Sequence, residues 1–261
     1  MFFSLILLVK GMRTIHKKHF NNFGYIVIQN RPQPMKKYYI RYALEFLVIT
    51  LGVTLSFFME YRREKQYKEQ LKEQSLSRVL QNLEIDNEDY GFNKFAHLDA
   101  LKAIRWIHQN HQNVSNFHPD TTGYYIQIAA FTSTTFYDNQ EEYRSLQNSG
   151  LIEFIEDEEI VIGLQNKYVT HEYMKHLEDE IDGFVERLKS YRHKNVHINS
   201  EKTNVRGYPI DATYTGAAEI PLEVVQALHE KRWWHQLYLK RVDELILGDQ
   251  LLIKEIQLEL E

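Results

Sequence analysis

The hydrophobic positions of the chain begin with one long apolar run. Between residues 42 and 59 the only charged residue is Glu45. With residues 38–40 in front, the run reaches about the 20 residues that a helix needs to cross a bilayer. The alternative is a buried helix of a soluble core, but residues 46–58 show no polar face. The pattern therefore predicts one membrane-spanning helix within residues 35–60.

Aromatic and basic residues at both ends of the run suit the two membrane interfaces. Those before it are Lys36, Lys37, Tyr38, Tyr39, Arg41 and Tyr42, and "EYRREK" follows it. Basic residues are similarly frequent on the two sides, so their bias does not decide the orientation. The further basic residues of the first 34 positions slightly favour a carboxy-terminal domain outside the cytoplasm.

One stripe of the predicted span carries its unusual residues. Glu45, Ile49, Gly52 and Ser56 follow one another at spacings that place them on one helix face. Small residues four apart let two helix backbones approach closely, so this face is a candidate seam for self-association. The alternative is that Glu45 only reaches the headgroup region or pairs with Arg41.

After the run, the spacing of hydrophobic residues is that of helices. We expect the first helix to continue into water with a heptad-like repeat at residues 76–90, and a second helix over about 93–112. A short helix capped by Asp138 or Asn139 should end at Gly150, and Asp157 should begin the next. That next helix has the clearest repeat: Met174, Leu177, Ile181, Phe184, Leu188 and Tyr191.

The predicted fold class is all-α: a single transmembrane helix that continues into an elongated antiparallel helical bundle. Residues 61–261 form the bundle, with an irregular section at 195–221 and a final helical pair opened by Pro221. Residues 1–34 form an N-terminal tail with two interpretations: a dispensable or mis-assigned extension, or a real tail that lies at the membrane interface. Their first apolar run is short and lacks a preceding basic residue, so it does not read as a cleaved signal sequence.

Three stretches of the chain form a recognisable pattern: "YALEFLVITLGVTLSFFMEYRREK", "LQNLEIDNEDY" and "TTFYDNQEEYRSLQNSGLIEFIEDEEIVIGLQNKYV". In these stretches, and over about residues 35–191, the chain resembles a family of uncharacterised bacterial single-span membrane proteins. The matching residues are Glu45, Gly52, Tyr143, Leu146, Ser149 and Gly150. "MEYRREK" departs from the Asn-Trp-rich exit of the family. The resemblance implies a helical protein anchored in the bacterial inner membrane, and it brings no known activity.

Candidate chemistry is sparse in this sequence. His193 and His197 have the i, i+4 spacing of a metal-binding helix, but the glutamate of a His-Glu-x-x-His site and a third ligand are missing. We expect no cofactor. A net charge of −5 without a basic block predicts no nucleic-acid partner, and the absence of cysteine excludes disulfides and thiolate chemistry.

The element "YRSLQNSG" has a structural and a functional interpretation. Tyr143 and Leu146 can fill a core while Gly150 ends a helix. Its polar members, Arg144, Gln147, Asn148 and Ser149, are alternatively a ligand or partner surface.

The leading functional hypothesis is an interaction, scaffold or sensory module. It would sit in the lipid bilayer as a homo-oligomer and act through a protein partner. Two alternatives remain: a membrane-associated metal-dependent enzyme that uses the histidines, and an ion- or proton-conducting oligomer built on Glu45.

Overall fold

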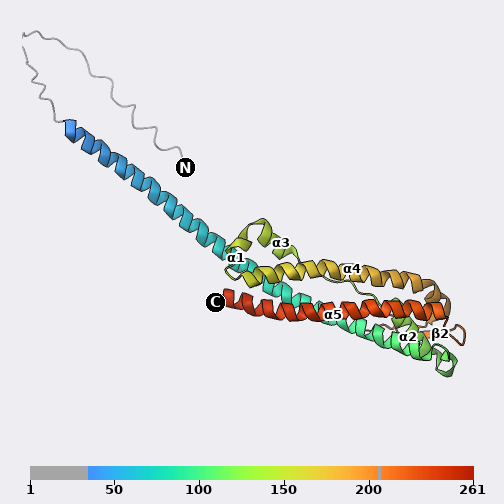
Figure 1. Cartoon of the computed structure of the whole chain (residues 1–261). Helices are drawn as coiled ribbons and strands as arrows, with labels where there is room; N and C mark the ends of the chain where they lie inside the picture. The colour runs from blue at the N-terminus through green and yellow to red at the C-terminus, as the bar shows by residue number, and fades with distance from the viewer. Residues whose placement is uncertain (1–34, 205–206) are drawn as a thin grey trace, which may run out of the picture. The chain divides into compact units, whose positions relative to one another are not determined.

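The computed structural model describes residues 35–204 and 207–261, so the predicted tail 1–34 lies outside the described residues. It confirms an all-α fold (Figure 1). The helices are α1 Met35–Asn110, α2 Pro119–Phe131, α3 Glu141–Asn148, α4 Glu158–Asn195 and α5 Leu222–Glu259, with 3-10 turns at Val114–Asn116 and Leu151–Phe154. Two short antiparallel strands, β1 Val196–Ile198 and β2 Ala212–Tyr214, complete the chain.

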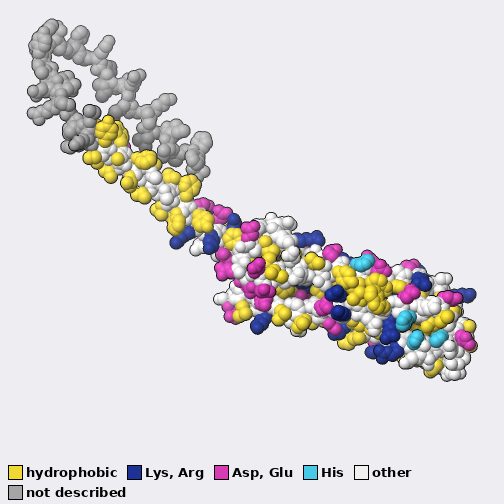
Figure 2. All heavy atoms as spheres, in the orientation of Figure 1, with side chains coloured by type: hydrophobic (Ala, Val, Ile, Leu, Met, Phe, Trp, Pro, Cys, Tyr) yellow, Lys and Arg dark blue, Asp and Glu magenta, His cyan; other side chains and the backbone are white. Residues whose placement is uncertain are grey.

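The chain divides into two compact units between Met59 and Glu60. In the first unit, every described side chain of α1 from Tyr38 to Met59 is exposed, and most of them are hydrophobic (Figure 2). Phe46 and Phe57 are 72% and 73% exposed. Among the described residues, α1 is the one helix long and apolar enough to cross a membrane.

Three long helices build the core of the second unit: residues 60–110 of α1, together with α4 and α5. A hydrophobic cluster at one end of this core contains Leu76, Leu164 and Ile256. The cluster at the other end contains Ile107, Leu188 and Val225. These groupings mean that α1 and α4 run in the same direction. Helix α5 runs antiparallel to both, and it lies beside α4 along its length (Figure 1).

A repeat of buried positions, spaced three or four residues apart, runs along these helices. In α1 they are Leu76, Val79, Leu83, Asp86, Tyr90, Asn93, His97 and Ala100. In α5 they are Val225, Leu228, Lys231, His235, Tyr238, Val242, Leu245, Asp249, Leu252 and Ile256. Such a repeat keeps one face of each helix turned toward its neighbours. Several of the positions that the repeat buries are polar, and these form the candidate site.

Two predicted helix breaks are wrong. No second helix begins at residue 93, because α1 continues through Gly91 to Asn110, and no helical pair follows Pro221, because α5 is a single helix through Gly248. A glycine inside a helix costs only about 1 kcal/mol relative to alanine, which the buried repeat on both sides offsets. The segment before Phe131 is helix α2, which begins at Pro119 with His118 as its N-cap.

The predicted helix ends near residues 150 and 157 are confirmed. Gly150 has a φ of 70° directly after the C-cap of α3, and the Asp157 carboxylate accepts a hydrogen bond from the Glu159 amide at the start of α4. The predicted cap of α3 is wrong, since Gln140 holds that position. Asp138 and Asn139 instead turn toward α4 and α1, where they bond to His171 and Asp86.

The irregular section at 195–221 contains the small β1–β2 sheet and an isolated bridge between Thr203 and Pro209. It lies against α2, where a Cβ at Gly123 would come within 2.4 Å of the Ala212 carbonyl oxygen. Before it in sequence, residues 132–140 form an irregular connection from α2 to α3, called the return segment below. This segment supplies several partners of the buried polar residues.

Candidate functional site

A buried ion cluster joins the three long helices. Lys167 of α4 places its Nζ atom 3.0 Å from Asp86 Oδ2 of α1 and 2.7 Å from Asp249 Oδ2 of α5. Nζ also donates a 2.7 Å hydrogen bond to the hydroxyl of Tyr90. The three charged side chains are at most 2% exposed. One ammonium group therefore serves two carboxylates and a phenol in the interior.

The burial of three charges has a desolvation cost that opposes the attraction between them. Burial raises the pKa of Asp249 to about 6, although Lys167 opposes the rise. Desolvation of buried charges often cancels their attraction, whereas loss of one partner leaves a buried charge uncompensated. Such a cluster fixes the relative positions of three helices, in the way that a polar residue at a core heptad position fixes register.

From Lys167 a chain of hydrogen bonds leads to the return segment. The Tyr90 hydroxyl, which accepts from Lys167, lies 2.7 Å from His171 Nε2, and His171 Nδ1 lies 2.8 Å from Asp138 Oδ1. Burial lowers the pKa of His171 to about 4, so the ring is neutral near pH 7. Tyr90 then donates to Nε2, and the Nδ1 proton is donated to Asp138. Lys175, which is partly exposed, bonds to the same carboxylate.

A second buried network lies farther along the bundle. Glu178 of α4 accepts hydrogen bonds from Thr134 at 2.9 Å, from Tyr238 at 3.1 Å and from the Phe136 amide at 2.9 Å. Burial nevertheless raises the pKa of Glu178 to about 7, so its carboxyl group titrates near neutrality. Thr134 and Phe136 belong to the return segment, and this carboxyl group therefore holds that segment against α4 and α5.

Two histidines extend the second network into α1 and α5. His97 Nε2 lies 2.9 Å from the Thr134 hydroxyl, and His97 Nδ1 lies 2.7 Å from His235 Nδ1. Because Thr134 donates to ionised Glu178, His97 donates to Thr134 and accepts from His235. Within the described residues, His235 Nε2 is buried without a hydrogen-bond partner. Burial also lowers the pKa of His235.

Lys231 of α5 is fully buried, and its side chain binds the C-terminal end of helix α2. Its ammonium group donates to the carbonyl oxygens of Ala129, Ala130 and Thr132 at 2.9–3.2 Å. The last carbonyls of a helix lack partners within the helix and attract a cation. Burial lowers the pKa of Lys231 to about 7.

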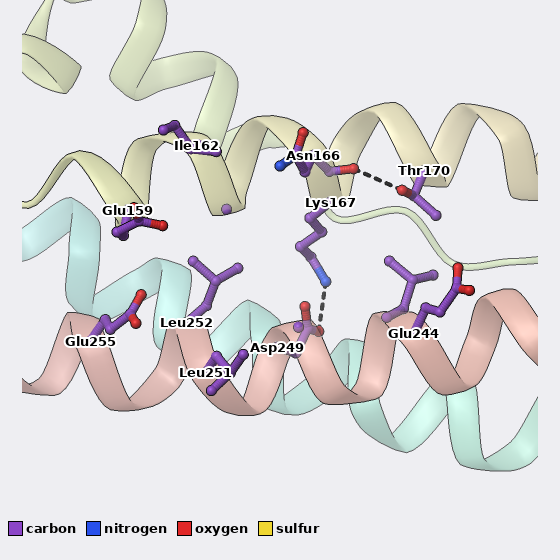
Figure 3. Close-up of a pocket in the computed structure, with 13 residues that line it drawn as sticks. Glu159, Ile162, Asn166, Lys167, Thr170, Glu244, Asp249, Leu251, Leu252 and Glu255 are labelled. Atoms are coloured by element: carbon purple, nitrogen blue, oxygen red, sulfur yellow. Dashed lines mark hydrogen bonds and ion pairs between the residues drawn. The ribbon is translucent and has the colours of Figure 1, made fainter.

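The surface next to the ion cluster is hollowed between α4 and α5 (Figure 3). This α4–α5 groove has a volume of about 280 Å³ and contains Lys167 and Asp249. The other lining residues are Glu159, Ile162, Gly163, Asn166 and Thr170 of α4, and Glu244, Leu245, Gly248, Leu251, Leu252 and Glu255 of α5. The ion cluster thus meets a mostly apolar groove that has an acidic rim.

The predicted seam lies on one exposed face of α1. Glu45 forms a 3.0 Å ion pair with Arg41, which matches the alternative interpretation of this carboxylate. A Cβ at Gly52 would have no neighbour within 4 Å, and the Ser56 hydroxyl bonds to the Gly52 carbonyl. Space beside Gly52 would allow a second helix to approach closely, and the seam stays a prediction.

The element at 143–150 has a buried apolar side and an exposed polar side. Tyr143 and Leu146 are buried in the hydrophobic cluster with Leu76, as the structural interpretation expects. The polar members Arg144, Gln147, Asn148 and Ser149 are exposed. Arg144 bonds to Gln140, and Gln147 bonds to Tyr143. A partner surface there stays a prediction.

The geometry assumed for the histidine pair is wrong. Helix α4 ends at Asn195, so His193 lies in its last turn while His197 lies on β1. His193 Nε2 is within 2.9 Å of Arg192. Among the described residues, no group of three or more histidine, aspartate or glutamate side chains could hold a metal ion.

The buried charged residues were not found from the sequence. Asp86, Lys167 and Asp249 each occupy a position of the buried repeat, but a charged residue within a helical repeat is ordinarily read as part of a solvated face. The sequence did contain one signal, which is the position of these residues within the helical repeat of buried positions. Extending the repeat through charged positions, instead of skipping them, would have placed all three in the core.

No family model, curated protein or solved structure matches this chain. The family resemblance described above therefore remains a prediction. Functional argument rests on the geometry of the chain itself.

Proposed function

We propose that this chain is a membrane-anchored interaction module. The observation that carries the proposal is the first part of α1, where hydrophobic side chains from Tyr38 to Met59 are exposed without interruption by a packed neighbour. A soluble protein rarely leaves so large an apolar surface open to water. A bilayer would cover it. The second unit, residues 60–261, would then offer its surfaces to a partner protein near the membrane.

The proposal includes self-association through the Glu45, Ile49, Gly52 and Ser56 face. Open space beside Gly52 supports it, since small residues allow close helix packing within lipid. We further propose the bacterial inner membrane as the location, with residues 60–261 outside the cytoplasm. The resemblance and the distribution of basic residues support this placement.

Cross-linking in cells tests the anchor and the seam together. Single cysteines are introduced as Gly52→Cys, Ser56→Cys and Val53→Cys, because the natural chain has no cysteine. Membrane fractionation should recover all three variants with the bilayer. Dimers linked through positions 52 and 56, but not 53, would support the seam. Recovery in the soluble fraction would reject the anchor, and equal linking at all three positions would reject the seam.

A further inference from the structure

We infer that the α4–α5 groove is the docking site for a basic amphipathic helix of a partner protein. The inference deepens the proposed function, because it names the surface of the interaction module and the chemistry of the partner. Helices commonly recognise partners by laying an apolar face into a hydrophobic groove. The argument rests on the shape of the groove, the residues on its ridges and its charge.

Exposed hydrophobic side chains run along both sides of the groove. On α5, Leu247, Leu251 and Leu258 are 55–60% exposed, and on α4, Ile162 and Val169 are 42% and 65% exposed. Ile162 and Leu251 line the groove. The other three lie four or seven residues from them along the same helix, a spacing that keeps them on the same helix faces. Leu247 and Leu258 lie eleven residues apart on α5, which is about 16 Å at 1.5 Å per residue. A ligand with three helical turns would cover this length.

Glycine keeps the floor of the groove open. Gly248 lies on the groove side of α5, and a Cβ built there would meet nothing within 4 Å. Gly163 on the facing helix has the opposite surroundings, because its Cβ would come within 2.5 Å of Leu252. The two helices thus approach closely at Gly163 and leave space at Gly248. A side chain of a docked helix can enter there.

The charge of the groove selects a basic partner. Four carboxylates line the groove, those of Glu159, Glu244, Asp249 and Glu255, against one lining ammonium group, that of Lys167. Asp86 shares that ammonium group. Of the four carboxylates, that of Glu244 also pairs with Arg241 outside the groove lining at 2.6 Å. Figure 3 shows Glu159 and Glu255 on one side of Asp249 and Glu244 on the other. Basic residues on both flanks of a docked helix would therefore meet carboxylates.

Asp249 offers a specific contact at the centre. Its side chain is 1% exposed, and both of its neighbours, Lys167 and Asn87, approach Oδ2. Neither contact involves its other oxygen, Oδ1. A lysine or arginine of the partner that reaches past Gly248 would approach this carboxylate from the groove.

A second copy of this chain fits the groove poorly. A symmetric dimer would place the groove against itself, and the carboxylates of Glu159, Glu244 and Glu255 would then repel their own copies. Two basic residues near the start of the second unit are already paired within the chain. Lys68 bonds to Glu64, and Lys72 bonds to Glu69 and Glu259. The partner is therefore a different protein.

Site-specific photo-cross-linking of the full chain in its cells tests the inference. A photoreactive phenylalanine analogue replaces Leu251, and the cross-linked segment of the partner is identified by mass spectrometry. The expected product carries a basic amphipathic helical segment. Glu244→Lys together with Glu255→Lys should reduce its yield about tenfold or more, since like charges would then face each other. Gly248→Leu should also abolish the product without unfolding the chain.

Glu186→Lys is the matched control for charge reversal. Glu186 pairs with Lys189 three residues away, as Glu244 pairs with Arg241, but it does not line the groove. This variant should leave the yield unchanged. The inference is overturned by cross-links only to lipid or to a second copy, by a product that charge reversal leaves intact, or by no product.

A second probe separates this inference from the proposed function. The photoreactive residue is placed at Gln147, on the exposed face of the element at 143–150. A membrane-bound chain that captures a partner from position 147 but not from 251 rejects the groove alone. A chain absent from the membrane fraction rejects the proposed function itself.

Discussion

Lys167 Nζ and Asp249 Oδ2 lie 2.7 Å apart on the facing helices α4 and α5, with both side chains almost fully buried. Asp86 of α1 approaches the same ammonium group to 3.0 Å. The two carboxylates therefore depend on one cation, whereas the cation has two anions. This asymmetry predicts unequal effects of removing the partners.

Lys167→Met should destabilise the second unit much more than Asp249→Asn. The first change leaves two buried carboxylates without their cation and should cost about 3–5 kcal/mol. The second leaves the Lys167–Asp86 pair intact and should cost about 1–2 kcal/mol. Denaturation of the detergent-solubilised chain, followed by tryptophan fluorescence, measures both, since Trp106, Trp233 and Trp234 all belong to this unit. Equal costs would contradict the shared role of Lys167.

Glu178 should make the folded state less stable as the pH rises through neutrality. Its pKa is about 7 in the folded protein against an ordinary value of 4.5, so the folded state binds the proton more tightly. Its contribution to stability is complete below about pH 4.5 and is lost through about pH 7. The loss between about pH 6 and pH 8 is on the order of 1 kcal/mol. Between about pH 6 and pH 8, the unfolding free energy of Glu178→Gln should therefore rise relative to that of the natural chain by on the order of 1 kcal/mol.

Lys231 should act in the opposite direction. Its pKa is about 7 in the folded protein against an ordinary value of 10.5, so above about pH 7 the unfolded chain binds more protons. Stability then rises with pH, again by on the order of 1 kcal/mol between about pH 6 and pH 8. The unfolding free energy of Lys231→Met should therefore fall with pH more steeply than that of the natural chain. A parallel pH profile for the two proteins would show that Lys231 is already charged when buried.

The two glycines at the α4–α5 contact should respond oppositely to alanine. Gly163→Ala should cost about 1–3 kcal/mol, because its Cβ would overlap the buried Leu252 side chain. Gly248→Ala should be neutral or stabilise the helix by about 0.5–1 kcal/mol, because nothing lies near the added methyl group. Thermal unfolding of both variants compares them directly. Destabilisation by Gly248→Ala would mean that the groove is closed in solution.

Much of the fold was predictable because helical periodicity is a strong signal. The apolar run, the repeat from Met174 to Leu188 and the ends marked by Gly150 and Asp157 all follow from local rules. Helix continuity through Gly91 was missed, since the cost of a helical glycine is local while the compensating burial comes from α4 and α5.

The site itself was not predictable by the same rules. Lys167 follows Gln165 and Asn166, and Glu178 precedes Asp179 and Glu180, so the sequence on one side of each is polar. Only the other helices and the return segment make them buried. Asp138 looked like a helix cap because its type and position fit one, but its partner His171 lies on another element. Contacts between distant segments carry this information.

Cysteine accessibility in native membranes tests the central claim, that residues 38–59 of α1 lie in a bilayer. Val53→Cys lies within the apolar run, and Gln74→Cys lies on the exposed face of α1 in the second unit. Membrane vesicles are opened so that the reagent reaches both membrane faces, while the bilayer itself stays intact. A water-soluble maleimide should then label position 74, and position 53 should stay unlabelled until detergent dissolves the bilayer and the protein is denatured. Equal labelling of the two positions in intact membranes would contradict a membrane anchor.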